Sequence, residues 1–204
     1  MNKFIFFLLL SITSLFAQDN ALVAFKHKDY NEAFKLYSIK AKNDDTSALN
    51  ALSYLYFNGL GTQKNEQKGI ELLERSADAN NKNAEYDLGM MYLIGSHVNK
   101  NHAKAFDYLT EASQHGHLDA KFNLSLMYYN GDATDSNITK TLELLESASS
   151  QGHTDSIKNI GRIYMQDFQF EKAVKWLKIN VKNGDEEAKY LLQEIYTQKE
   201  ELKN

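Results

Sequence analysis

The sequence has no cysteine and no proline. Without cysteine there is no disulfide framework, no thiolate metal site and no cysteine nucleophile, and without proline there is no polyproline or collagen-like segment. Arginine is also scarce, since Arg75 and Arg162 are the two arginines in 204 residues. Because 23 Lys and Arg stand against 27 Asp and Glu, the net charge is −4, and we expect no nucleic-acid partner.

Residues 1–17 have the three parts of a secretory signal peptide. Lys3 supplies a positive charge, residues 4–16 form an apolar run, and Ala17 is a small residue before a polar segment. The run of 13 residues is shorter than the about 18 to 20 residues that span a bilayer. We therefore predict cleavage near Ala17 and a periplasmic or secreted mature chain, in which no second run is long enough to cross a membrane.

A segment of the chain recurs at a spacing of 36 residues. Its copies superpose without a gap over Ser47–Gly59, Asn83–Gly95, Asp119–Gly131 and Asp155–Asp167. A partial copy with Ala188, Leu192 and Tyr196 follows at a spacing of 32. Between these segments runs a second family, whose copies start at Lys68, Lys104, Lys140 and Lys172. A fixed period of this length is typical of repeat architectures.

Each repeat is predicted to be a pair of helices. In the first helix, the apolar residues recur at i, i+4, i+7 and i+8 on one face, as in Ala84, Leu88, Met91 and Tyr92. Glycine follows each of the first three copies at Gly59, Gly95 and Gly131, where it favours a left-handed helix end. Small residues recur where the paired helices must approach closely, at Ser53, Gly89, Ser125 and Gly161 of the first helices and at Gly69, Ala105, Thr141 and Ala173 of the second helices.

We therefore expect an all-α solenoid, because one helix pair cannot bury its apolar face alone. The expected layout is a single domain over residues 18–204, with about five helix-pair repeats followed by a C-terminal capping helix over residues 186–204. The approximate repeats are residues 18–46, 47–82, 83–118, 119–154 and 155–185.

With these segments and this period, the chain resembles the Sel-one-like repeat (SLR) family of the tetratricopeptide superfamily. The resemblance implies a right-handed α-solenoid that is a scaffold for protein contacts and has no chemistry of its own. Some secreted, cysteine-rich members are described as penicillin-binding or β-lactamase-like, which gives the alternative of a cell-envelope enzyme or a peptidoglycan-associated protein. The positions of their cysteines hold Ser113 with Lys121 and Ser149 with Ile157 here, so their disulfides are absent.

Catalytic and metal-binding patterns are weak. The chain has no Ser-x-x-Lys, Lys-Thr-Gly, Gly-x-Ser-x-Gly or His-Glu-x-x-His motif, and we expect no catalytic residue and no cofactor. His115, His117 and His153 are the candidate metal ligands. The preferred interpretation places His117 and His153 in turns before first helices, where Asp119 or Asp155 satisfies free backbone N–H groups. We therefore expect no metal.

The acidic residues of the second helices are expected on an outer, solvated face, alternating with lysine. They are Glu71, Glu74, Asp107, Glu111, Glu143 and Glu146. That face offers no facing pair of carboxylates for glycoside hydrolysis.

The strongest functional pattern lies on the first helices, which are apolar nearly all round. We expect the side turned away from the partner helix to line a concave groove that binds an unidentified protein or peptide. The groove residues are predicted to be Asn50, Tyr54, Phe57, Asn83, Tyr86, Met90, Leu93, Phe122, Leu126, Tyr129, Lys158, Arg162 and Met165. Tyrosine and methionine are residue types that anchor such ligands. Two alternatives remain: the same residues pack between successive first helices, or the chain is an adaptor that assembles through its convex face.

Overall fold

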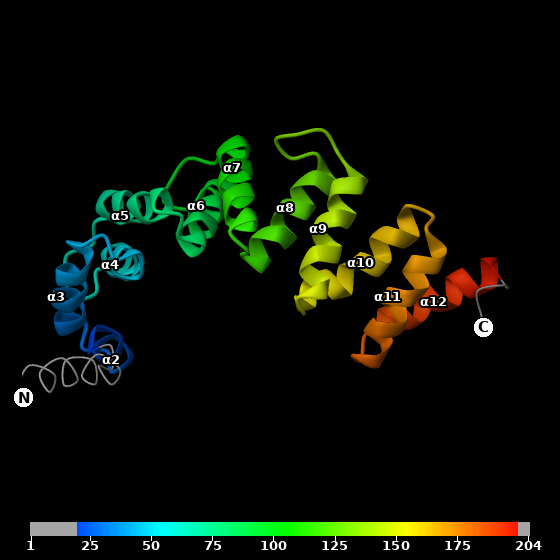
Figure 1. The fold of residues 1–204 in the computed structure, drawn as a ribbon, viewed down its shortest axis with the longest axis horizontal. Helices are drawn as coiled ribbons and strands as arrows, with labels where there is room; N and C mark the ends of the chain where they lie inside the picture. Colours follow the sequence, from blue (N-terminus) through cyan, green and yellow to red (C-terminus); the bar gives the residue numbers. More distant parts are fainter. Residues whose placement is uncertain (1–19, 200–204) are drawn as a thin grey trace, which may run out of the picture. The chain divides into compact units, whose positions relative to one another are not determined.

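The computed structural model describes residues 20–199. The expected signal peptide over residues 1–17 and the last residues of the expected capping segment lie outside this part of the chain. Within residues 20–199, the chain forms eleven α-helices and no strand, which confirms the predicted all-α solenoid of paired helices (Figure 1). Among the described helices, none combines the length and the apolar character that a membrane span requires.

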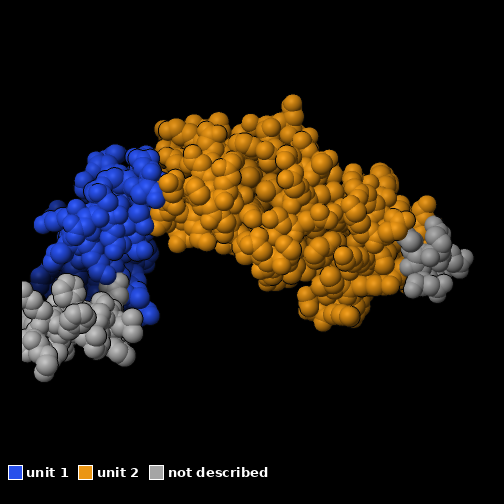
Figure 2. Space-filling model, in the orientation of Figure 1, with its two compact units in different colours: residues 1–79 blue, residues 80–204 orange. Residues whose placement is uncertain are grey.

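The helices form two compact units, one ending at Ala79 and the other starting at Asn80 (Figure 2). The first unit contains α2 (Asn20–Lys26), α3 (Tyr30–Ala41), α4 (Thr46–Asn58) and α5 (Glu66–Asp78). In this unit α2 packs against α3 and α4 packs against α5. Its core is built from small and aliphatic residues, including Ala33, Ala48, Leu49, Leu52 and Leu55.

The second unit contains three helix pairs and one further helix. The pairs are α6 (Lys82–Ile94) with α7 (His102–Gln114), α8 (Leu118–Asn130) with α9 (Ile138–Ser150), and α10 (Thr154–Gln166) with α11 (Phe170–Lys182). The seventh helix, α12 (Glu186–Gln198), packs against α11 and buries Ala188, Leu192 and Ile195. Each of the three pairs in the second unit combines a first helix and a second helix of the sequence repeat (Figure 1).

The paired helices approach closely at the small residues that the sequence repeats. A Cβ atom added to Gly89 of α6 would lie 2.8 Å from the Leu109 side chain of α7. A Cβ atom added to Gly161 of α10 would lie 2.9 Å from Leu177 of α11. Both distances are too short for a real contact, so the repeated small residue sets the closest approach of each pair.

The ends of the first helices follow the sequence pattern in three copies and depart from it in one. Gly59, Gly95 and Gly131 have the left-handed conformation at the ends of α4, α6 and α8, as predicted. Helix α10 instead ends at Gln166 with Asp167 as its C-cap, and the exposed Phe168 that follows has a φ of +58°. The four-residue shortening of the last repeat therefore places a bulky side chain where glycine is favoured.

Candidate functional site

The predicted groove residues of the first unit lie on α4 and do not share one environment. The Tyr54 side chain is 49% exposed, and its ring makes an edge contact with Phe25 at a centroid distance of 5.7 Å. The Phe57 ring lies against α5, because a Cβ atom at Gly69 would be 2.8 Å from it. Asn50 is half-buried. In this unit, Tyr54 is the predicted groove residue that the structure leaves most open to a partner.

The predicted groove residues of the second unit lie on α6, α8 and α10, and all of them retain exposed surface. Asn83 and Lys158 are exposed, and the rest are half-buried, namely Tyr86, Met90, Leu93, Phe122, Leu126, Tyr129, Arg162 and Met165. Several of them also contact the buried core, so the same side chain packs against the core with one part and is open to solvent with another. The exposed surface of these residues is called the first-helix face below.

Two aromatic rings of the first-helix face rest on imidazoles that start the next first helix. The Tyr86 ring of α6 stacks on His117 with a centroid distance of 4.3 Å and an interplanar angle of 13°. The Phe122 ring of α8 lies 5.4 Å from the His153 ring at a tilt of 41°. Residues 86 and 122 are one repeat apart, as are residues 117 and 153, so the same contact occurs twice.

The imidazoles cap the helices that they precede. The Nδ1 atom of His117 accepts a hydrogen bond from the Ala120 backbone N–H at 3.3 Å, at the start of α8. The Nδ1 atom of His153 accepts from the Ser156 N–H at 3.2 Å, at the start of α10. The prediction that aspartate satisfies these N–H groups is therefore wrong, because the imidazole reaches them from the N-cap position.

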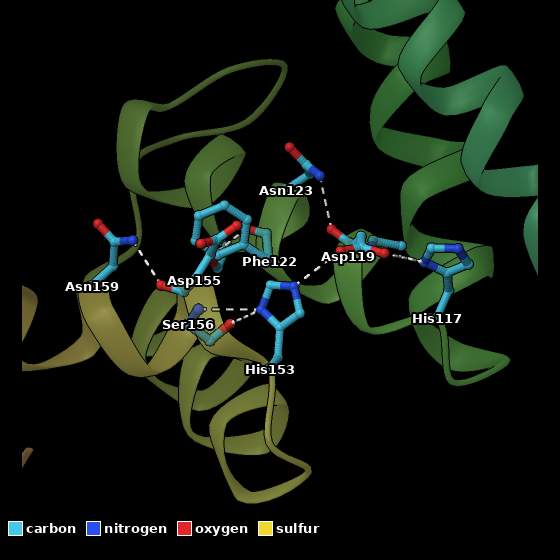
Figure 3. A network of polar contacts seen from close by, with 10 residues as sticks. His117, Asp119, Phe122, Asn123, His153, Asp155, Ser156 and Asn159 are labelled. Carbon is cyan, nitrogen blue, oxygen red and sulfur yellow. Dashed lines mark hydrogen bonds and ion pairs between the residues drawn. The ribbon is translucent and has the colours of Figure 1, made fainter. Parts of the chain in front are cut away.

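Asp119 instead contacts the capping histidine of the next first helix and lies near its own (Figure 3). Its Oδ1 atom lies 3.0 Å from His153 Nε2, and its Oδ2 atom lies 3.9 Å from His117 Nδ1. The Asn123 side chain donates to the Asp119 main-chain oxygen at 2.8 Å, and Asn159 makes the same contact with Asp155 at 2.7 Å. The starts of α8 and α10 are thus tied together by one polar network.

Carboxylates surround the Tyr86 ring at this surface. Burial raises the pKa of the Tyr86 hydroxyl, and the negative charges of Asp119 and Asp87 raise it further. Burial also raises the pKa of the Asp87 carboxyl to about 6. The face around Tyr86 therefore combines aromatic surface with two carboxylates.

The C-terminal part of the first-helix face is held by polar contacts between first helices. The Arg162 guanidinium of α10 binds Glu187 of α12 at 2.6 and 3.1 Å. The Tyr129 hydroxyl of α8 donates to the Gln166 side chain of α10 at 2.8 Å. Arg162 and Tyr129 therefore connect neighbouring helices, in addition to being accessible.

The structure contains an open pocket of about 850 Å³ beside the start of α12. Lys158 is the predicted groove residue that lines it, together with Asn180 and Asp185 among others. A smaller pocket of about 320 Å³ is lined by Glu146, Tyr164 and Lys172 among others. In the part of the chain that the structure describes, no group of three or more His, Asp or Glu side chains is arranged to hold a metal ion.

The acidic residues of the second helices are exposed as predicted, except Glu74, which is half-buried. Glu71 pairs with Lys68 and Glu143 pairs with Lys140, both at 2.7 Å and both three residues apart on one helix. Glu146 is also exposed, and it accepts a hydrogen bond from the Tyr164 hydroxyl. These contacts are surface ion pairs and hydrogen bonds of a solvated helix face.

One polar pair was missed by the sequence reasoning. Glu85 of α6 is only 1% exposed, and both of its carboxylate oxygens lie 2.8 Å from His115 Nδ1 at the end of α7. In the repeat alignment, Glu85 occupies the position of the buried Leu49. The same position holds Lys121 and Ile157 in the next two copies, so the repeat pattern did not mark this side chain as buried and paired.

The profile of the Sel1 repeat matches residues 26–45, 46–81, 82–117 and 118–153, which is more than half of the chain. No curated protein sequence matches at a significant level.

Solved structures with a similar fold include a Sel1 repeat protein from Oxalobacter formigenes, at 24% identity and a TM-score of 0.78, covering 87% of this chain and 74% of that one. A protective antigen of uropathogenic Escherichia coli with an SLR fold has 22% identity and a TM-score of 0.75, covering 83% of this chain and 37% of that one. An immunity protein from Pseudomonas aeruginosa has 22% identity and a TM-score of 0.50, covering 83% of this chain and 68% of that one.

Proposed function

Because the chain belongs to the Sel1 repeat family, we propose that it is a scaffold that binds a protein or peptide through its first-helix face. The observation that carries this proposal is the partial exposure of the predicted residues on α6, α8 and α10. A row of side chains serving only as core would be fully buried, as Leu88, Leu109 and Ile160 are. Partly exposed aromatic and methionine side chains give a partner a large contact area.

The aromatic residues of this face are also held in place before a partner arrives. Tyr86 is stacked on His117, and Phe122 lies on His153. Side chains that are already ordered lose less conformational entropy on binding, which raises affinity for the same contact area. The first-helix face of the second unit therefore has both the residue types and the order of a binding surface.

Site-specific photocrosslinking in the native cell tests this proposal. A benzoylphenylalanine placed at Leu126, on the first-helix face, is compared with one placed at Glu111, on the exposed side of α7. We expect a discrete adduct from position 126 that position 111 does not give. That adduct is expected to be lost when Tyr86, Met90 and Phe122 are replaced together by alanine.

The control for that triple variant is Asp107, Glu111 and Glu143 replaced by alanine, because all three are exposed on second helices. Both variants are first compared with the wild type by thermal unfolding. Identical adducts from positions 126 and 111, or an adduct that survives the first-helix variant, would refute binding through this face.

We further propose that the scaffold acts in the periplasm or outside the cell. The support is the signal-peptide pattern around Lys3 and Ala17, a part of the chain outside the described residues. The expected mature protein begins at Gln18, and mass spectrometry of its N-terminal peptide from fractionated cells measures this directly. Recovery of the full-length chain from the cytoplasm would contradict export.

A further inference from the structure

Two first helices of the second unit are capped by histidine, whereas the others carry carboxylate or amide caps. Helices α8 and α10 start at His117 and His153, while α6 starts at Asn81 and α12 starts at Asp185. Aspartate and asparagine side chains accept a helix N–H through an oxygen at any neutral or mildly acidic pH. Imidazole accepts it only through an unprotonated nitrogen, so these two caps depend on the protonation state of histidine.

The contacts of His153 fit the tautomer that carries its proton on Nε2. Nδ1 accepts from the Ser156 N–H at 3.2 Å, which requires a lone pair on this nitrogen. Nε2 lies 3.0 Å from Asp119 Oδ1 and donates its proton there, so both ring nitrogens are satisfied in the neutral ring. A proton added to Nδ1 would face the Ser156 N–H, and the helix start is itself an unfavourable place for positive charge. The Ser156 hydroxyl, 2.9 Å from Nδ1, can turn to accept that proton, but the backbone N–H cannot.

His117 is in a similar position, with more charges around it. Its Nδ1 accepts from the Ala120 N–H, and Asp119 lies 3.9 Å away. Burial lowers the pKa of His117 below its ordinary value of 6.5, the Asp119 charge opposes this, and the Lys82 charge lowers the pKa further. Because the folded protein holds this proton less tightly than the unfolded chain, the stability contributed by neutral His117 is lost as pH falls below about 6.5.

Other titratable groups near the two caps act differently in acid. On α6, Tyr86 covers His117, and Glu85 pairs with His115 of α7, two residues before the cap. The Asp87 carboxyl, with its pKa raised to about 6 by burial, gains a proton in the same range and loses its negative charge. Asp155 lies in the first turn of α10, where its negative charge is favoured.

We propose that His117 and His153 make the first-helix face sensitive to acid, because protonation releases the first turns of α8 and α10. This regulation rests on the proposed binding function. The Tyr86 and Phe122 rings lie on the two imidazoles, so opening of the caps removes the surfaces that order them. Acid would therefore weaken partner binding without unfolding the helix pairs, which are joined by apolar contacts such as Gly89 with Leu109.

Amide hydrogen exchange without any partner tests the caps. In the wild type, protection of the Ala120 and Ser156 amides, corrected for intrinsic exchange, is expected to fall about fivefold per cap between pH 7.5 and 5.0, because a helix cap contributes about that factor. The ¹⁵N shifts of His153 at pH 7.5 are expected to show a proton on Nε2 and none on Nδ1.

The matched variant is His117→Asn with His153→Asn, since Asn81 shows that asparagine caps the same repeat position. It should keep protection of both amides at pH 7.5 and lose the acid-dependent fall, whereas His27→Asn in the first unit should behave as the wild type. An equal fall in the double variant, or no fall in the wild type, would overturn the proposal.

A second measurement separates this proposal from the binding function. The adduct from position 126 is measured at pH 7.5 and 5.0 in the wild type and in the double asparagine variant. If the binding proposal fails, no adduct forms at either pH. The hydrogen-exchange data then still show whether the two caps open in acid. An adduct that weakens about tenfold in acid only in the wild type supports regulation, and an equal adduct at both pH values in the wild type refutes it.

Discussion

The helix pairs α6/α7 and α10/α11 share the close approach of their two helices and differ at their helix ends. In both pairs a glycine of the first helix faces a leucine of the second, and an added Cβ atom would lie 2.8 Å from Leu109 at Gly89 and 2.9 Å from Leu177 at Gly161. Their caps, their polar partners and their connections are different. The comparison shows that close approach of the two helices is what the fold requires, and that the helix ends are free to vary.

The differences gather at the ends of the helices. The first pair has an asparagine cap and a loop that includes Gly95, and it buries Glu85 against His115. The second pair has an imidazole cap and the short connection through Phe168. The two pairs therefore differ at their helix ends, while the shared contact sets how closely the helices of each pair approach.

The largest effect is expected where the two pairs agree. Gly89→Val and Gly161→Val should each lower the free energy of unfolding by about 3 kcal/mol, because an added side chain must displace the facing leucine. Urea denaturation of the two variants measures this. Gly89→Ser is the matched control, since Ser53 and Ser125 occupy the same repeat position, and it should cost clearly less. Unequal losses for the two valine variants would contradict the claim that both pairs depend equally on close approach at the glycine.

A smaller effect is expected at the polar pair that only α6/α7 contains. His115→Ala should lower the free energy of unfolding by about 2 kcal/mol, because it leaves the buried Glu85 carboxylate without its hydrogen-bond partner. Adding Glu85→Leu to that variant should restore stability to within about 1 kcal/mol of the wild type, since the equivalent Leu49 is fully buried. A double variant as unstable as His115→Ala would show that the carboxylate is not the cause of the loss.

The smallest effect is expected at the connection that only α10/α11 contains. Phe168→Gly should raise the free energy of unfolding by about 1 kcal/mol, because it removes a bulky side chain from a left-handed backbone conformation. His97, at a φ of +62° in the connection of α6/α7, is the comparison. Histidine tolerates this conformation better than phenylalanine does, so His97→Gly should gain less. A loss of stability in Phe168→Gly, measured by urea denaturation, would mean that the exposed ring makes a stabilising contact.

Much of the fold follows from local patterns in the sequence. The period of 36 residues, the apolar spacing of the first helices and the glycines at Gly59, Gly95 and Gly131 predict the helix pairs and their ends. These signals are local or strictly periodic, so they can be recognised without knowing which side chains meet. The end of α10 was also marked by the shortened spacing, although the conformation of Phe168 was not.

The candidate site was only partly predictable. The residue types of the first-helix face were predicted, and the structure leaves them partly exposed in the second unit, while Phe57 of the first unit lies against its partner helix. Asp119 was assigned to cap its own helix, yet it contacts His153 of the next first helix. Such contacts join residues about one repeat apart, and the choice among neighbouring polar groups depends on side-chain geometry.

By itself, the sequence determined that this chain is a stack of helix pairs without disulfides. Helix periodicity, the spacing of small residues and the absence of cysteine are all visible in the order of the residues. Only the tertiary structure decided that His117 and His153 are the caps, that Asp119 contacts His153 and that Glu85 is buried against His115. The physical reason is that the choice among competing hydrogen-bond partners depends on differences of a few tenths of an ångström in their distances. Those distances exist only once the helices are packed.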